Sequence, residues 1–252
     1  MSVVLPFPKP VAGLRARIEE IEGHRAAGSA VLPFGIAALD GALPGGGLPC
    51  GRLHEAAGGG RDANDGAAVA AFVAGIAART TGAIVWCVTR ADLFPPGLAA
   101  AGLAPDRVLL VSASEDRVVL AVMEEALRSP GVGAVVGEVS GLSLTASRRL
   151  QLAAETSGAI GLALRRSRRA AEAGTFGEPT AATTRWRIST LPSGRLPVPG
   201  VGRSRWRVEL LRVRGGEPAE FILEATDATG RLSLPADLAD GSGALRGARA
   251  GA

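Results

Sequence analysis

The feature that most constrains the fold is a regular alternation of short apolar segments with helix-periodic segments between Gly51 and Leu164. Apolar runs of about four to eight residues are typical of buried strands, and apolar residues three and four apart indicate helices. The expected strands are Gly51–Ala57, Ala83–Val88, Val108–Ser112, Gly133–Val139 and Ile160–Leu164. The expected helices are Gly66–Arg79, a segment within Pro96–Gly102, Glu115–Arg128 and Thr145–Thr156. This order predicts an α/β fold with a mostly parallel sheet flanked by helices.

The segments outside this alternation set the expected domain limits. Apolar residues at helical spacing predict an amphipathic helix at 11–23, so residues 1–30 are taken as an N-terminal helix and linker. This helix could dock on its own domain or on a neighbouring chain. Residues 31–238 form the expected α/β domain, which includes a basic loop at 165–184 and C-terminal strands within 185–226. Glycine at Gly215 and Gly216 predicts a β-hairpin extension there, and residues 239–252 have the composition of a disordered tail.

Several classes of function receive no support from the sequence. Cys50 and Cys87 are the only cysteines and lie far apart, and His24 and His54 are not grouped with metal-ligand partners. We therefore expect no disulfide framework and no metal site. The chain also shows no signal-peptide pattern and no apolar run long enough to span a membrane, which predicts a cytoplasmic protein without membrane contact. No Ser, Cys or His constellation indicates a catalytic residue.

The glycine-rich segment after the first expected strand has the layout of a phosphate-binding loop without its chemistry. A working loop reads GxxxxGK[ST], in which the lysine contacts phosphate oxygens and the hydroxyl holds Mg²⁺. When Gly58 is taken as the first glycine, Ala63 stands at the second glycine, Asn64 at the lysine and Asp65 at the hydroxyl. Lys9 is the only lysine, so Arg61 is the one surrogate cation in the loop. We interpret Gly58, Gly59 and Gly60 as retained for the fold rather than for ATP hydrolysis.

The order and spacing of four features resemble the RecA-type recombinase core over residues 31–165. These are the GIAALDGAL segment, the GGGLPCGRLHE run, the glycine loop with its helix, and the later strand–helix–strand unit VLLVSASEDRVVLAVMEEALRSPGVGAVVGEV. The segments GAVVGEVSGLSLTASRRLQLAAE and GRSRWRVELLRVRGGEPAEF resemble the ImuA family of RecA-like accessory proteins of inducible mutagenesis.

The resemblance implies a role in the response to DNA damage. The implied partners are an ImuB-type polymerase-like protein and an error-prone replicative-type DNA polymerase in translesion synthesis, with RecA and single-stranded DNA as further partners. It also implies an acid at the end of the strand that finishes at Val139. In the recombinase frame Gly137 takes that place and Glu138 follows it, while Asp92 is the nearest candidate for a water-activating acid.

The basic residues are concentrated in one part of the chain. Between Arg165 and Arg214 there are twelve arginines and three acidic residues, although the formal net charge of the whole chain is only +4. In one interpretation Trp186 and Trp206 are core residues and the flanking arginines form a solvated face. In the other, the arginines bind nucleic-acid phosphates. A protein partner for this region is equally compatible with the pattern. The candidate DNA- or partner-binding residues are Arg165, Arg166, Arg168, Arg169, Arg185, Arg187, Arg203, Arg205 and Arg207.

Three hypotheses of function follow from these patterns. The first is a non-hydrolysing RecA-like scaffold that positions translesion polymerases and needs no cofactor. The second is a DNA-dependent ATPase or recombinase with an atypical loop that uses ATP and Mg²⁺. The third is a cell-division inhibitor of the same damage response that acts through protein contacts. The missing lysine favours the first.

Overall fold

The computed structural model describes residues 30–60, 63–166, 174–194, 200 and 202–235. The expected helix at 11–23 and the expected tail at 239–252 lie outside these residues. The larger sheet contains β3 (Leu53–Gly58), β4 (Ala83–Val88), β5 (Val108–Ser112), β6 (Val132–Val139), β7 (Ile160–Arg165), β8 (Thr184–Leu191), β9 (Arg205–Val213) and β10 (Ala219–Glu224). The helices are α2 (Ala37–Gly41), α3 (Ala63–Ala78), α4 (Pro95–Ala100), α5 (Asp116–Arg128), α6 (Leu144–Ser157) and two short 3-10 turns, η1 (Pro105–Arg107) and η2 (Gly174–Gly177).

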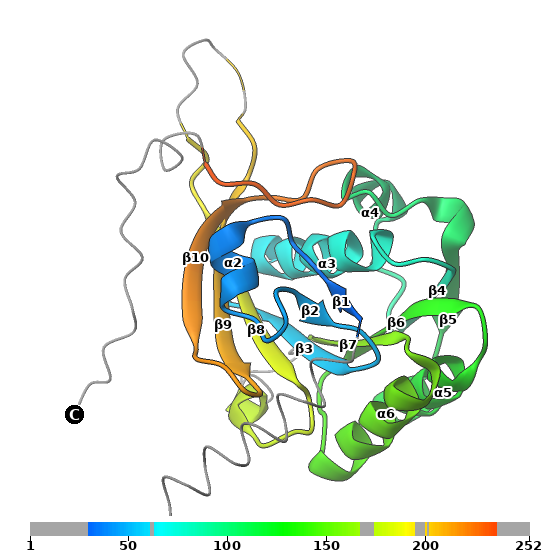
Figure 1. Ribbon diagram of the computed structural model, residues 1–252. Coiled ribbons are helices and arrows are strands. Elements are labelled where there is room, and N and C mark those ends of the chain that lie inside the picture. The colour runs from blue at the N-terminus through cyan, green and yellow to red at the C-terminus, as the bar shows by residue number, and fades with distance from the viewer. Residues whose placement is uncertain (1–29, 61–62, 167–173, 195–199, 201, 236–252) are drawn as a thin grey trace, which may run out of the picture.

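The eight strands lie in the order β10-β9-β8-β3-β7-β6-β4-β5 (Figure 1). Every pair from β8 to β5 is parallel, and β9 and β10 are antiparallel to their neighbours. The predicted mostly parallel sheet with a C-terminal hairpin is therefore confirmed. Between β9 and β10 the chain turns at Gly215, whose φ of 77° is a conformation that glycine adopts without strain.

Two structured features near the start of the domain were not predicted. Val31–Leu32 (β1) pairs with Leu48–Pro49 (β2) in a small antiparallel sheet, and α2 lies between these strands in the chain. Asp40 fixes this segment because its carboxylate accepts hydrogen bonds from the backbone N–H groups of Phe34 and Gly35 at 2.7 and 2.8 Å.

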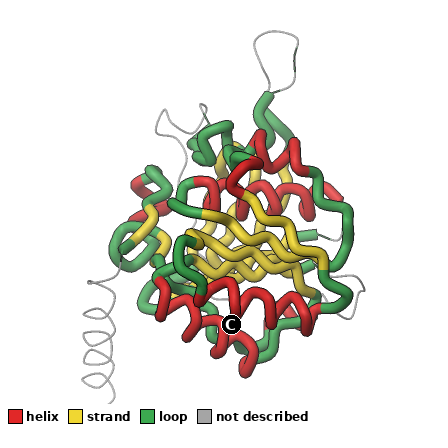
Figure 2. The backbone as a smooth tube through the Cα atoms, turned by 90° about the vertical axis from the view of Figure 1, so that its right-hand side faces the viewer, coloured by secondary structure: helices red, strands yellow, loops and turns green. Residues whose placement is uncertain are grey.

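Helices cover both faces of the sheet, as Figure 2 shows. On one face α2, α3 and α4 pack in a core that includes Phe34, Phe72, Trp86 and Trp186. On the other face α5 and α6 pack over β6 and β7 through residues such as Met123. The central strands β4, β6 and β7 are apolar because both of their faces are buried, whereas the edge strand β5 exposes Leu109 and Leu110. The carboxyl ends of the parallel strands thus meet along one edge of the sheet, where ligands of open α/β sheets usually bind.

Local signals set the ends of α6. The side chain of Ser143 accepts a hydrogen bond from the backbone N–H of Ala146 at the start of the helix. At its end Gly158 takes a left-handed conformation with φ 82°. No helix in the described ranges is both long and apolar enough to cross a membrane.

Candidate functional site

A large open cleft of about 1530 Å³ follows the carboxyl edge of the sheet. The glycine loop after β3 and the first half of α3 form one wall, together with the segment that leads into α4. The ends of β7, η2, β8 and β9 form the other wall. The cleft therefore brings together the glycine loop and the arginine-rich segments that the sequence singled out separately.

The glycine loop continues the hydrogen-bond ladder between β3 and β8. The backbone N–H of Gly59 donates to the carbonyl oxygen of Ile188 at 2.7 Å, so this amide is already used within the protein. A Cβ atom at position 59 would lie 1.8 Å from Oγ of Ser189, and one at position 58 would lie 3.1 Å from the backbone of Asp65. Close packing against β8 and α3 thus leaves little space for a side chain at Gly58 and Gly59. Arg61 lies outside the described residues.

Asp65 fills the position where the phosphate-loop motif carries its hydroxyl. This residue lies in the first turn of α3 and is only 6% exposed. Its Oδ1 accepts hydrogen bonds from the backbone N–H and the hydroxyl of Thr190, at 2.7 and 2.8 Å. Of the other two motif positions, Ala63 is the first residue of α3 and Asn64 is exposed. The carboxylate therefore ties the start of α3 to β8 instead of facing an open metal site.

Arg166 bridges Glu138 and Asp92, the two acids that the comparison with the recombinase motif pointed out. The guanidinium group donates to Glu138 at 2.7 Å and to both oxygens of Asp92 at 3.1 Å. Burial lowers the pKa of Arg166, but the nearby Glu138 and Asp92 outweigh this effect and hold the pKa above its ordinary value. The second oxygen of Glu138 accepts from Nε1 of Trp86 at 3.0 Å. Glu138 is thus committed to contacts within the chain.

The one-residue offset between Gly137 and Glu138 places them on opposite faces of the sheet. A Cβ atom at Gly137 would lie 2.1 Å from the sulfur of Met123, so this position faces α5. Glu138 lies on the α3 side with Trp86. Gly137 is therefore needed for packing against α5, and the acid that reaches the carboxyl edge is Glu138.

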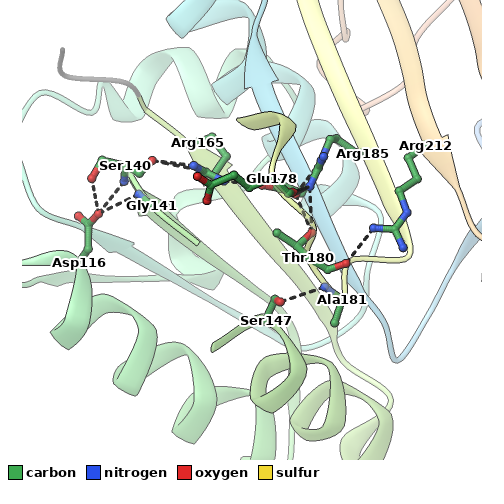
Figure 3. A network of polar contacts seen from close by, with 11 residues as sticks. Asp116, Ser140, Gly141, Ser147, Arg165, Glu178, Thr180, Ala181, Arg185 and Arg212 are labelled. Atoms are coloured by element: carbon green, nitrogen blue, oxygen red, sulfur yellow. Dashed lines mark hydrogen bonds and ion pairs between the residues drawn. The ribbon is translucent and has the colours of Figure 1, made fainter. Parts of the chain in front are cut away.

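A buried ion-pair cluster lies on the α6 side of the cleft. Glu55 in the middle of β3 is fully buried, and its two oxygens contact the guanidinium groups of Arg165 at 2.6 Å and Arg185 at 2.9 Å. The hydroxyl of Thr180 donates to Glu55 at 3.0 Å, and the carbonyl oxygen of Thr180 accepts from Arg212 at 2.8 Å (Figure 3). One carboxylate therefore serves two buried arginines, and Arg212 contacts the same segment.

Comparison with known proteins identifies the family. No protein-family model matches the chain. Two relatives, both named Protein ImuA, come from Caulobacter vibrioides strains NA1000 / CB15N and ATCC 19089 / CIP 103742 / CB 15. Each is 46% identical over 208 residues, which are 79% of this chain and 84% of the relative.

The chain belongs to the ImuA family. The crystal structure of the RadB recombinase matches it with a TM-score of 0.55 and 16% identity, over 81% of this chain and 99% of that one. At this identity the match shows the fold alone, and it confirms the predicted RecA-like architecture. The chain is thus a RecA-like member of the mutagenesis-associated ImuA family.

In this ImuA-family chain the predicted DNA- or partner-binding arginines that the structure describes fall into three groups. Arg165 and Arg185 are buried against Glu55 and are not part of a solvated face, because β3, β7 and β8 are adjacent. Arg166 is partly exposed and bridges Glu138 and Asp92.

The remaining described candidates lie on or beside β8 and β9 and are half-buried or exposed: Arg187, Arg203, Arg205 and Arg207. Arg168 and Arg169 lie outside the described residues. Trp186 and Trp206 are both core residues, as one of the two interpretations required.

Three residues of the site were not singled out from the sequence. Glu55 was readable as an acid within an apolar strand, which signals a buried partner. Arg212 was counted among the basic residues, but nothing in its local sequence separates it from its neighbours. Phe94 lines the cleft with 69% of its surface exposed, and the two prolines that follow it gave no indication of this.

Proposed function

We propose that the protein is a non-hydrolysing RecA-like accessory protein of DNA-damage-induced translesion synthesis. The observation that carries this proposal is the bond between Asp65 and Thr190, at the position where a phosphate loop holds Mg²⁺. Membership of the ImuA family supports a role in the DNA-damage response, because that family is associated with mutagenesis.

Electrostatics argue against triphosphate binding at the loop. A phosphate oxygen brought to ~4 Å from the Asp65 carboxylate meets a repulsion of about 4 kcal/mol at an effective dielectric of 20. The amide of Gly59 is already paired with Ile188, and Asn64 carries no charge to offset this repulsion. Arg166 holds Glu138 and Asp92, so neither acid is free to position a metal-bound water.

The protein then works through partners rather than through hydrolysis. The proposed partners are an ImuB-type polymerase-like protein and an error-prone replicative-type DNA polymerase in the cytoplasm, with RecA as a further candidate. Contact with single-stranded DNA through the basic strands β8 and β9 belongs to the same proposal. Arg207 on β9 and Arg203 just before this strand support it because both are exposed cations, which form surface ion pairs with Glu220 and Glu224.

Two measurements on the full-length protein test this function. The first is ATP hydrolysis with and without single-stranded DNA, for which we expect no turnover above a protein-free control. The second is capture of the purified polymerase-like partner by this protein, for which we expect a stable complex without ATP. DNA-stimulated hydrolysis that an Arg61→Ala change abolishes would establish the ATPase hypothesis instead. Capture of a cell-division protein without any polymerase component would establish the division-inhibitor hypothesis.

A further inference from the structure

The far wall of the cleft is lined by arginines from β7, β8 and β9. Arg165, Arg185 and Arg212 gather around the single carboxylate of Glu55. Within the described part of the chain, Arg212 pairs with no carboxylate, and its one hydrogen bond goes to the carbonyl oxygen of Thr180. Burial lowers the pKa of Arg212, and the nearby Arg185 and Arg214 lower it further. Such a cluster favours an anion placed beside it.

Arg187 extends this charge along the same wall. Its side chain is 41% exposed and forms an ion pair with Glu209 at 3.6 Å, which leaves part of the guanidinium group open to solvent. Arg185 and Arg187 alternate along β8 with the core residue Trp186, so both lie on the face opposite α3. Arg212 is paired with Arg185 in the register of β8 and β9. Two accessible guanidinium groups, those of Arg187 and Arg212, thus lie along one strand-lined surface of the cleft.

The opposite end of the cleft presents an aromatic ring. Phe94 is 69% exposed, which is the largest exposure among the large apolar side chains of the described ranges. Pro95 and Pro96 begin α4 immediately after it and restrict the backbone there. An exposed aromatic ring in a basic cleft is the arrangement on which unpaired bases stack.

The size of the cleft favours a polymeric ligand over a small molecule. Its volume of about 1530 Å³ is larger than that of ordinary small-molecule pockets, which is roughly 300 to 1,000 Å³. Its walls come from both faces of the sheet, since α4 packs on the α3 side whereas Arg185 and Arg187 face the other way. A flexible strand can follow such a path over the sheet edge.

We propose that this cleft binds single-stranded nucleic acid, with a base stacked on Phe94 and backbone phosphates on Arg187 and Arg212. This inference rests on the proposed function, which includes contact with single-stranded DNA, and it assigns that contact to the cleft. The sequence had suggested Arg165 and Arg185 for this contact, but both are buried, so the inference assigns the contact to solvent-accessible residues. Binding needs no nucleotide because its contacts come from Phe94, Arg187 and Arg212.

The test uses the full-length protein and a fluorescently labelled oligothymidylate, with affinity measured by fluorescence anisotropy. Phe94→Ala and Arg212→Gln should each weaken binding about fivefold or more, the loss expected for one stacked base or one phosphate contact. Arg212→Gln should also make the dependence of log K on log salt shallower by about 0.7, which a purely structural role would not do. Arg117→Gln and Leu152→Ala are matched controls, because these exposed residues on α5 and α6 lie away from the cleft, and both should leave affinity unchanged.

A Phe94→Trp variant gives a second readout that does not depend on loss of binding. The three native tryptophans are buried or nearly so, so the new indole reports on the cleft. We expect oligothymidylate to quench its fluorescence and to bind with affinity close to that of the native protein. Unchanged fluorescence on saturation with oligothymidylate would overturn the proposal. Equal quenching by Mg-ATP, or by a poly-glutamate peptide, would also overturn it and assign the cleft to a nucleotide or an acidic protein.

Polymerase capture by the same variants separates the two proposals. If Phe94→Ala and Arg212→Gln lose DNA but still capture the polymerase-like partner, both proposals stand. If the native protein captures the partner but binds no oligothymidylate, only the cleft assignment fails. If it binds oligothymidylate through these residues but captures no polymerase component, the accessory function fails and the cleft assignment stands.

Discussion

The carboxylate of Asp65 accepts two hydrogen bonds from Thr190 and thereby ties the first turn of α3 to the end of β8. The two residues are 125 positions apart in the chain, and their contact lies just after the glycine loop. In the phosphate-loop frame this position would carry the hydroxyl that holds Mg²⁺, and here its side chain makes a contact within the fold. The side chain at this position should therefore affect the stability of the protein.

Replacing Asp65 with alanine should destabilise the protein without affecting any hydrolysis. The change leaves the partly buried backbone N–H of Thr190 without its acceptor, which costs about 1–3 kcal/mol in the free energy of unfolding. Asp65→Asn keeps an acceptor oxygen in place, so its loss should be smaller. Urea unfolding of the three proteins measures the difference. Equal stability of the alanine variant and the native protein would show that this contact does not hold α3.

The buried cluster at Glu55 predicts a larger effect. Glu55→Gln leaves Arg165 and Arg185 buried without their shared counter-charge, and breaking a buried pair in this way costs about 3–5 kcal/mol. The matched control is Glu115→Gln, which removes an exposed contact with Arg117 and should leave the unfolding midpoint almost unchanged. Thermal or urea unfolding compares the two. A loss at Glu55 no larger than at Glu115 would contradict the arrangement described for β3, β7 and β8.

His54 makes the stability of the fold depend on pH. Burial lowers its pKa to about 4 from the model-peptide value of 6.5, and its ring contacts Thr184 at 2.8 Å and the carbonyl oxygen of Pro49 at 2.9 Å. Between pH 6.5 and 4 the unfolded chain binds a proton at this residue that the folded protein does not. Stability therefore falls as the pH drops through this window, by roughly 2 kcal/mol at pH 5 relative to neutral pH.

The comparison with His54→Gln isolates this contribution. Glutamine does not titrate and offers a donor and an acceptor of similar reach. Urea unfolding of both proteins at pH 7 and pH 5 should show the native protein losing more stability than the variant. Parallel losses in the two proteins would mean that His54 does not carry this dependence.

The sequence predicted the order of elements well because each strand and helix has its own local period. AIVWCV and GAVVGEV are apolar runs, and both segments are strands in the structure, as expected. The small sheet of β1 and β2 was missed because two-residue strands show no period. The hairpin of β9 and β10 was found because Gly215 and Gly216 mark its turn.

The candidate site was harder to predict because its contacts join distant parts of the chain. The motif frame identified Asp65, but only the adjacency of β3 and β8 brings it to Thr190. Arg165 and Arg185 look like any other arginines of a basic segment. Their burial depends on Glu55, which is 110 and 130 positions away in the sequence. Charge density along the chain therefore overestimates how much cationic surface the folded protein presents.

Restoring the phosphate-loop residues should not restore ATP hydrolysis. A double change of Asn64→Lys and Asp65→Ser supplies the missing cation and hydroxyl, yet the Gly59 amide stays paired with the carbonyl oxygen of Ile188. Arg166 also stays bound to Glu138 and Asp92, so no acid is available to activate water. We expect no turnover from this variant in a phosphate-release assay, and at most a gain in Mg-ATP affinity by calorimetry. Adding Arg166→Ala is the informative third step, because it removes the cation that Glu138 and Asp92 share while leaving the backbone hydrogen bond from Gly59 to Ile188 in place. If the double variant alone hydrolyses ATP, the backbone pairing of the loop is not the barrier, and the non-hydrolysing assignment would depend on two side chains only.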